Sequence, residues 1–107
     1  MATSSDYIEF VMDSLSLINN IEFRYRKMFG EYCVYSNDKP IMLVCDNTVY
    51  VKMLPCIEMY MQDAAIGEPY TGAKPHYILD IESCHDLEKI VRQLEYNTPL
   101  PKPKKKK

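Results

Sequence analysis

The chain has 107 residues, of which 47% are hydrophobic and 26% charged, values typical of one globular domain with an ordinary core. No apolar run approaches the roughly 18 residues that a membrane-spanning helix needs, and the first residues, MATSSDYIEF, lack the cationic and apolar regions of a secretory signal. Five of the 13 basic side chains lie in the last six residues, so residues 1–101 hold eight basic against 15 acidic side chains, a formal charge of −7. This balance argues against a basic face for duplex DNA on the folded part, and we expect a cytoplasmic protein.

A helix is predicted over residues 5–18. Ser4 or Ser5 can cap its first turn, and Asn19-Asn20 tolerates the backbone geometry that ends a helix. Its apolar residues recur at helical spacing: Ile8, Val11, Met12, Leu15 and Ile18.

Four strands are predicted next, because the period changes from helical to alternating at Phe23 and Tyr25, which alternate with Arg24 and Arg26. Gly30 interrupts this first strand. The other three are predicted over residues 31–36, 41–45 and 48–53, with turns at Asn37-Asp38 and Asp46-Asn47. Such short connections make the four strands an antiparallel meander.

The second half of the chain predicts two more helices and one more strand. Pro55 suits the first position of a helix that Gly67 ends, with Ile57, Tyr60, Met61, Ala64 and Ala65 as its inner face. Residues 67–76 hold two glycines and two prolines and are predicted as loop, and residues 76–81 as a fifth strand. Ser83 is the predicted cap of a last helix whose stripe is Leu87, Ile90, Val91 and Leu94.

The predicted order is therefore α-β-β-β-β-α-β-α. Each helix has one apolar stripe and must cover a sheet face or another helix, which predicts an α+β fold with two layers: an antiparallel sheet of about five strands with helices packed on it. We expect one domain over residues 1–97 and a disordered basic tail over residues 98–107.

The stretch YRKMFGEYCVY at 25–35 allows two interpretations. As an interaction surface it would stack bases on tyrosine rings and bind phosphates with its cations, using Arg24, Tyr25, Arg26, Lys27 and Tyr32. As structure it is a hairpin with tyrosine rings on the core. Glu22 and Glu31 flank the cations, which favours the hairpin.

The four cysteines, Cys33, Cys45, Cys56 and Cys84, form no C-x-x-C pair, so we expect reduced thiols and no zinc site. Cys84 with His85 in a first helical turn offers a second functional hypothesis, a thiol enzyme or redox sensor, although a capped structural turn explains the pair more simply. The three glycines make no phosphate loop, and no cofactor is expected.

The basic tail consists of Lys102, Lys104, Lys105, Lys106 and Lys107. Such a run can contact nucleic-acid phosphates without sequence preference, or an acidic protein; solubility alone explains it almost equally well. A membrane partner is not expected.

Three stretches resemble the TfoX N-terminal domain family, named from bacterial regulators of competence: YRKMFGEYCVY, IMLVCDNTVYVKM at 41–53 and GEPYTGAKPHYILDI at 67–81. The likeness covers roughly residues 5–95. The family usually has Met-Phe-Gly-Gly-Tyr, whereas Glu31 follows Gly30 here, and the full regulators carry a C-terminal domain where this chain has its lysine tail. The resemblance implies a two-layer α+β fold and a regulatory role without catalysis.

We therefore expect a non-enzymatic interaction module that binds another protein, with the transcription machinery as the expected source of that partner, and weak nucleic-acid contact through the tail. The alternatives are the Cys84 thiol hypothesis and a single-strand nucleic-acid binder that uses the tyrosine-bearing sheet.

Overall fold

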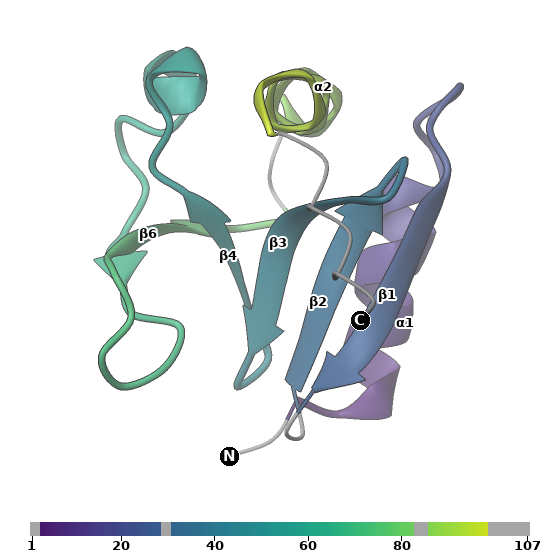
Figure 1. Cartoon of the computed structure of the whole chain (residues 1–107), viewed down its shortest axis with the longest axis horizontal. Coiled ribbons are helices and arrows are strands. Elements are labelled where there is room, and N and C mark those ends of the chain that lie inside the picture. Colours follow the sequence, from purple (N-terminus) through teal and green to yellow (C-terminus); the bar gives the residue numbers. More distant parts are fainter. Residues whose placement is uncertain (1–2, 29–30, 83–85, 99–107) are drawn as a thin grey trace, which may run out of the picture.

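The computed structural model describes residues 3–28, 31–82 and 86–98, which form a six-stranded antiparallel sheet with helices packed against it (Figure 1). The strands stand in the order β1-β2-β3-β4-β6-β5, and each neighbouring pair is antiparallel. The elements are α1 (Ser5–Leu15), β1 (Phe23–Met28), β2 (Glu31–Ser36), β3 (Lys39–Cys45), β4 (Thr48–Lys52), the 3₁₀ helix η1 (Pro55–Tyr60), β5 (Ile66–Gly67), β6 (His76–Leu79) and α2 (Leu87–Asn97). The predicted α+β class is confirmed, with six strands instead of about five.

Helix α1 begins where the sequence predicts and ends earlier. The Ser4 hydroxyl accepts a hydrogen bond of 3.1 Å from the backbone N–H of Tyr7 and caps the first turn. The predicted end at Ile18 is wrong, because the helix stops at Leu15 and the N–H of Ile18 bonds back to the Leu15 carbonyl in a tighter turn. Ile18 is nevertheless buried, so it belongs to the apolar stripe as predicted, although the predicted helix was longer than the observed one.

The meander of β1 to β4 is confirmed. Both predicted turns have two residues with positive φ, Asn37 and Asp38 at 48° and 69°, and Asp46 and Asn47 at 53° and 55°. These values belong to the type I′ turn, whose twist matches that of the flanking strands, and Asn and Asp tolerate it better than most residues. The predicted turn at Gly30 lies outside the described residues.

The second predicted helix is only a short 3₁₀ turn, η1. Pro55 opens it as expected, but the chain leaves the helix at Met61, and the Ala65 carbonyl accepts a hydrogen bond from the N–H of Ile78 on β6. Residues 66–67 then pair with β6 as the sixth strand, so Gly67 belongs to a strand and does not end a helix. Pairing with β6 therefore prevails over helix propensity in this segment.

The last strand and helix are present as β6 and α2. The predicted cap at Ser83 lies outside the described residues, and Asp86 stands at the start of α2 without a side-chain cap bond. Lys39, at the start of β3, joins the end of α2, since its ammonium lies 3.4 Å from the Glu95 carboxylate and 2.9 Å from the Glu95 carbonyl oxygen. Of the predicted tail only Thr98 is described, and it is buried.

The core lies on one face of the sheet. Alternate strand residues point to this face and are buried: Tyr32, Val34, Met42, Val44, Val49, Val51, Tyr77 and Leu79. They pack in one cluster with the buried residues of the helices, among them Val11 of α1, Ile57 of η1 and Val91 of α2. In Figure 1, α1 lies behind β1 and β2, so the opposite face of these strands is turned toward the viewer.

Candidate functional site

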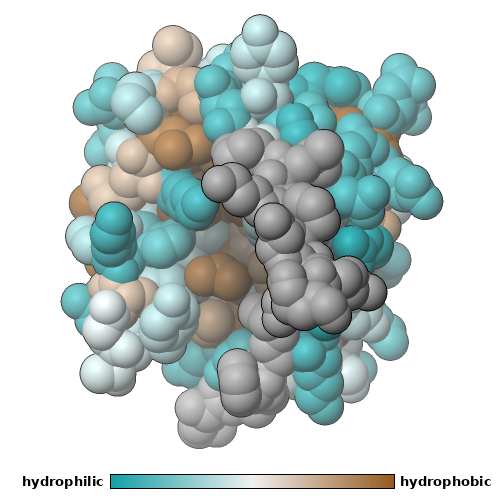
Figure 2. All heavy atoms as spheres, in the orientation of Figure 1, coloured by the Kyte–Doolittle hydropathy of each residue, from teal (hydrophilic) through white to brown (hydrophobic). Residues whose placement is uncertain are grey.

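The face of the sheet opposite α1, hereafter the open face, carries the residues that alternate with the core. The strand register places five of them in one row across the sheet: Arg26, Cys33, Leu43, Tyr50 and Ile78. Cys33 is buried within this row, whereas the Leu43, Tyr50 and Ile78 side chains are half-buried. The middle of the open face is therefore apolar and partly exposed to solvent, and hydrophobic residues are visible near the centre of the view in Figure 2.

A groove of about 250 Å³ lies at the middle of this face. Its walls come from four strands of the sheet, β2, β3, β4 and β6, and from the end of α2, and they include Cys33, Leu43, Tyr50, Lys52, His76 and Leu94. A volume of this size accommodates one or two side chains of a partner and is smaller than the clefts that enclose most small-molecule ligands.

Basic side chains border the apolar middle. Arg24 and Arg26 point to the open face from β1, and Lys52 does so from β4; all three are exposed. The Arg24 guanidinium carbon lies 4.6 Å from the centroid of the Tyr35 ring, and its Nε donates to the Asp38 carboxylate at 3.1 Å. The open face is thus a cationic region on a body that is acidic as a whole.

Titration behaviour reflects the same arrangement. Burial raises the pKa of the Cys33 thiol, while a hydrogen bond from Tyr35 and the positive charges of Arg26, Arg24 and Lys52 act in the opposite direction. Burial likewise raises the pKa of Tyr50, and the negative potential of Cys45, Asp46 and Glu31 adds to the effect. Cys33 and Tyr50 are therefore protonated and neutral near pH 7, and suit apolar contact better than nucleophilic chemistry.

The structure divides the predicted interaction surface between the two faces of β1 and β2. Arg24 and Arg26 lie on the open face, while Tyr25, Lys27 and Tyr32 point to the side that α1 covers. Tyr32 is buried, and its ring meets Tyr25 edge-on with centroids 5.3 Å apart. The five residues thus form no single stacking platform.

Sequence reasoning missed Leu43, Tyr50 and Tyr35 as surface residues. The signal was present in β4, where Tyr50 and Lys52 alternate with Val49 and Val51, which are buried. Following that alternation across the meander would have predicted the open face.

Cys84 and His85, on which the thiol hypothesis depends, lie outside the described residues. The lysines of the predicted tail lie outside them as well. Cys33, Cys45 and Cys56 are unpaired thiols. In the parts of the chain that the structure describes, no three His, Cys, Asp or Glu side chains gather closely enough to hold a metal ion. Nor does any helix there have the length and apolarity to cross a membrane.

The comparisons with known proteins identify one relative in particular. A protein of Spirochaeta aurantia, described as "Uncharacterized 12.7 kDa protein in trpE 5'region", is 32% identical over 109 residues, covering 100% of this chain and 93% of that protein. No family model matches the chain.

Proposed function

The chain belongs to the same family as the uncharacterized 12.7 kDa protein in the trpE 5'region of Spirochaeta aurantia, and we propose that it is a small non-enzymatic regulatory module that binds another protein through its open face. In this proposal its role resembles that of the N-terminal domain of the TfoX competence regulators. The partner belongs to the transcription machinery, and the lysine tail adds loose contact with nucleic acid.

One observation supports the proposal above the others: the apolar middle of the open face is bordered by exposed cations. Leu43, Tyr50 and Ile78 leave apolar surface in contact with water, while Arg24 and Lys52 stand at its margin. An apolar centre that includes an aromatic side chain and is bordered by charged side chains is the composition of many protein-binding surfaces.

Photo-crosslinking tests this proposal. A photoreactive phenylalanine replaces Tyr50 in the full chain, and in a matched variant replaces Tyr96, which is 81% exposed on α2 and is not among the residues that line the groove. We expect irradiation in cells of the source organism to join a defined protein to position 50 and not to position 96. Equal crosslinking from both positions, or none from position 50, would contradict the proposal.

Single-strand nucleic acid is the second candidate for this face, because its tyrosines and cations also suit base stacking. The Arg24 guanidinium already covers the Tyr35 ring, which leaves Tyr50 as the half-exposed aromatic of the row. We therefore rank protein binding first. A chain that ends at Tyr96 lacks the lysine tail. If this shorter chain still binds oligothymidylate at moderate salt, the ranking would be reversed.

A thiol enzyme or redox sensor at Cys84 is the remaining alternative. Its test is the rate of alkylation of each cysteine as a function of pH. If Cys84 reacts at neutral pH no faster than a model thiol, this alternative fails.

A further inference from the structure

The outer edge of β1 is a strand edge without a partner among the described residues. β1 is the terminal strand of the sheet and pairs with β2 alone. The N–H of Asn37 bonds to the Glu22 carbonyl at 2.8 Å, and register alternation from this bond turns the N–H and C=O groups of Phe23, Tyr25 and Lys27 away from β2. These three residues therefore offer a row of backbone donors and acceptors at the edge.

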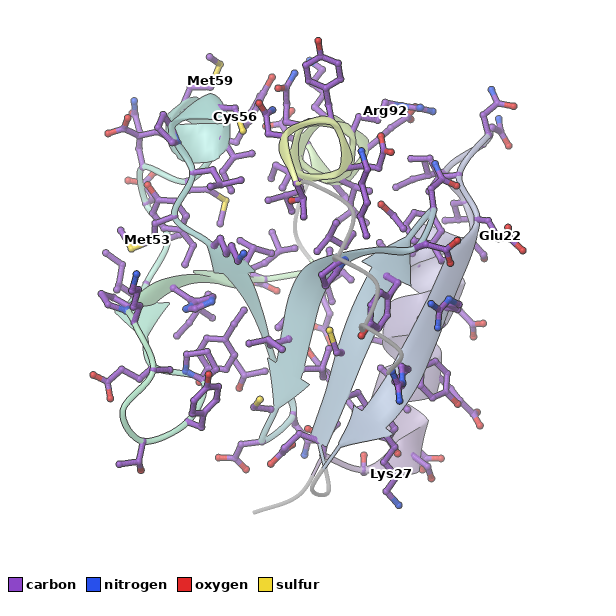
Figure 3. All side chains as sticks on the ribbon, viewed as in Figure 1. Glu22, Lys27, Met53, Cys56, Met59 and Arg92 are labelled. Atoms are coloured by element: carbon purple, nitrogen blue, oxygen red, sulfur yellow. The ribbon has the colours of Figure 1, made fainter. Side chains whose placement is uncertain are left out.

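The charge of this edge restricts what can pair with it. Arg24, Arg26 and Lys27 are exposed, and the strand contains no acidic residue; Figure 3 labels Lys27 near the end of β1. Three of the eight basic side chains of residues 1–101 thus lie within six consecutive residues of a body whose formal charge is −7. Within the described ranges, Arg26 and Lys27 form no ion pair, and Arg24 pairs only with the exposed Asp38.

Like charges directly opposite each other destabilise a strand pair. If two copies of the chain paired through β1, the cations of one strand would face the cations of the other and repel them. The positively charged lysine tail would be repelled from this edge in the same way. An extended segment with carboxylates at alternate positions fits instead, because Arg24 and Arg26 point to one face and are two residues apart. Apolar residues between the carboxylates would lie beside Tyr25, which is 44% exposed on the other face.

We propose that the β1 edge accepts an extended acidic segment of a partner protein as an added strand of the sheet. Main-chain hydrogen bonds to Phe23, Tyr25 and Lys27 supply affinity, and carboxylates at alternate positions, facing Arg24 and Arg26, supply selectivity. This inference rests on the proposed function, since the added strand would extend the same open face.

The probe is a labelled peptide of alternating Glu and Val residues, titrated into the full chain and followed by fluorescence anisotropy and amide hydrogen exchange. We expect binding that slows exchange at the outward amides of Phe23, Tyr25 and Lys27 and leaves that of Arg24 and Arg26, already bonded to β2, nearly unchanged. A peptide of alternating Lys and Val should not bind. Protection confined to Leu43 and Tyr50, or equal binding of the basic peptide, would overturn the inference.

Two variants separate charge from backbone pairing. The double variant Arg24→Glu with Arg26→Glu should bind the acidic peptide about tenfold or more weakly and should bind the basic peptide. The control, Lys74→Glu with Lys89→Glu, makes the same charge change elsewhere on the surface and should change neither binding. Lys27→Pro should weaken binding by removing one outward N–H. If circular dichroism shows that Lys27→Pro is unfolded, the variant Arg24→Glu with Arg26→Glu still tests the inference. Unchanged binding of the acidic peptide by that double variant would overturn it.

The peptide and the crosslinking experiments fail independently. A partner captured at position 50 while the acidic peptide does not bind would refute strand addition and leave the proposed function standing. Oligothymidylate that protects the same three outward amides more strongly than the peptide would also refute it.

Discussion

Thr3 and Glu31 lie 28 positions apart, and the Thr3 hydroxyl donates a hydrogen bond of 2.7 Å to Oε1 of Glu31. The same oxygen accepts the backbone N–H of Thr3 at 3.1 Å and that of Asp46 at 3.0 Å. One carboxylate therefore joins the N-terminal segment, the start of β2 and the turn between β3 and β4. This contact gives a structural role to Glu31, the residue that follows Gly30 in the sequence.

Replacing this carboxylate should destabilise the fold. Glu31→Ala leaves three donors without this acceptor, two of them on buried Thr3, and we expect the free energy of unfolding to fall by about 1–3 kcal/mol. Urea unfolding measures the change. The matched control is Glu58→Ala, an exposed carboxylate on η1 with no hydrogen bond to the described residues, which should change stability by about 0.5 kcal/mol or less. Equal midpoints for both variants would contradict this role.

Ser36 presents the opposite case, a buried polar group without a partner. Its side chain is 0% exposed, and its hydroxyl oxygen has no hydrogen-bond partner among the described residues. Ser36→Ala removes the unsatisfied hydroxyl at small cost in packing, so we expect stability unchanged or higher by up to about 1 kcal/mol. Ser14→Ala is the control, because that hydroxyl donates to the Phe10 carbonyl at 3.0 Å. A clear loss of stability in Ser36→Ala would show that the hydroxyl is satisfied in solution.

The sequence predicted the meander well because its turns are local. Asn37-Asp38 and Asp46-Asn47 specify two-residue hairpins by their own conformational preferences, and hairpins fix the neighbours of each strand. Strand β5 could not be predicted in this way, since its two residues depend on pairing with β6.

The candidate site was harder to predict than the fold. The apolar run at 41–45 conceals which residues face the core, because a register shift at Val34/Tyr35 leaves Ile41 without an opposite residue, so that Ile41 and Met42 are both buried. Because alternate residues of a strand point to opposite faces, the sequence could have shown that Arg24 and Arg26 do not share a face with Tyr25. They were grouped together only because they are close in sequence. The contribution of Leu94 to the groove depends on how α2 packs, and no local pattern reports that.

The Cys45 thiol predicts how stability depends on pH. Burial raises its pKa from 9.0 to about 11, and the negative charge of Glu31 adds to the shift. In the unfolded chain this thiol loses its proton near pH 9, whereas in the folded chain it keeps the proton until about pH 11. Its contribution to stability is therefore complete below pH 9 and lost progressively as the pH rises from about 9 to about 11.

Urea unfolding at successive pH values checks this contribution in the wild type and in Cys45→Ala. The variant should show a smaller fall in stability over the alkaline range, while its loss of buried volume should lower stability equally at every pH. Part of the fall should remain, because burial also raises the pKa of Cys33, Tyr35 and Tyr50. Parallel curves for the two proteins would refute the assignment to Cys45.

The cations of the open face should matter little for folding. The ion pair of Arg24 with Asp38 is exposed, its side chains being 51% and 71% accessible, and an exposed contact of Arg24 with the Tyr35 ring is worth about 0.5–1 kcal/mol. We therefore expect Arg24→Glu with Arg26→Glu to lower the free energy of unfolding by about 1 kcal/mol or less. A change of that size would allow weaker partner binding in this variant to be assigned to the surface itself.

Lys39→Ala provides the contrasting measurement. Its ion pair with Glu95 is more enclosed, with side chains 21% and 24% accessible, and the ammonium also donates to the Glu95 carbonyl at 2.9 Å. Because this contact joins β3 to the end of α2, its loss should cost about 1–2 kcal/mol, more than reversal of both arginines. If the arginine pair proved the more costly change, these side chains would be holding the sheet together, and their exposure on the open face would no longer indicate a binding role.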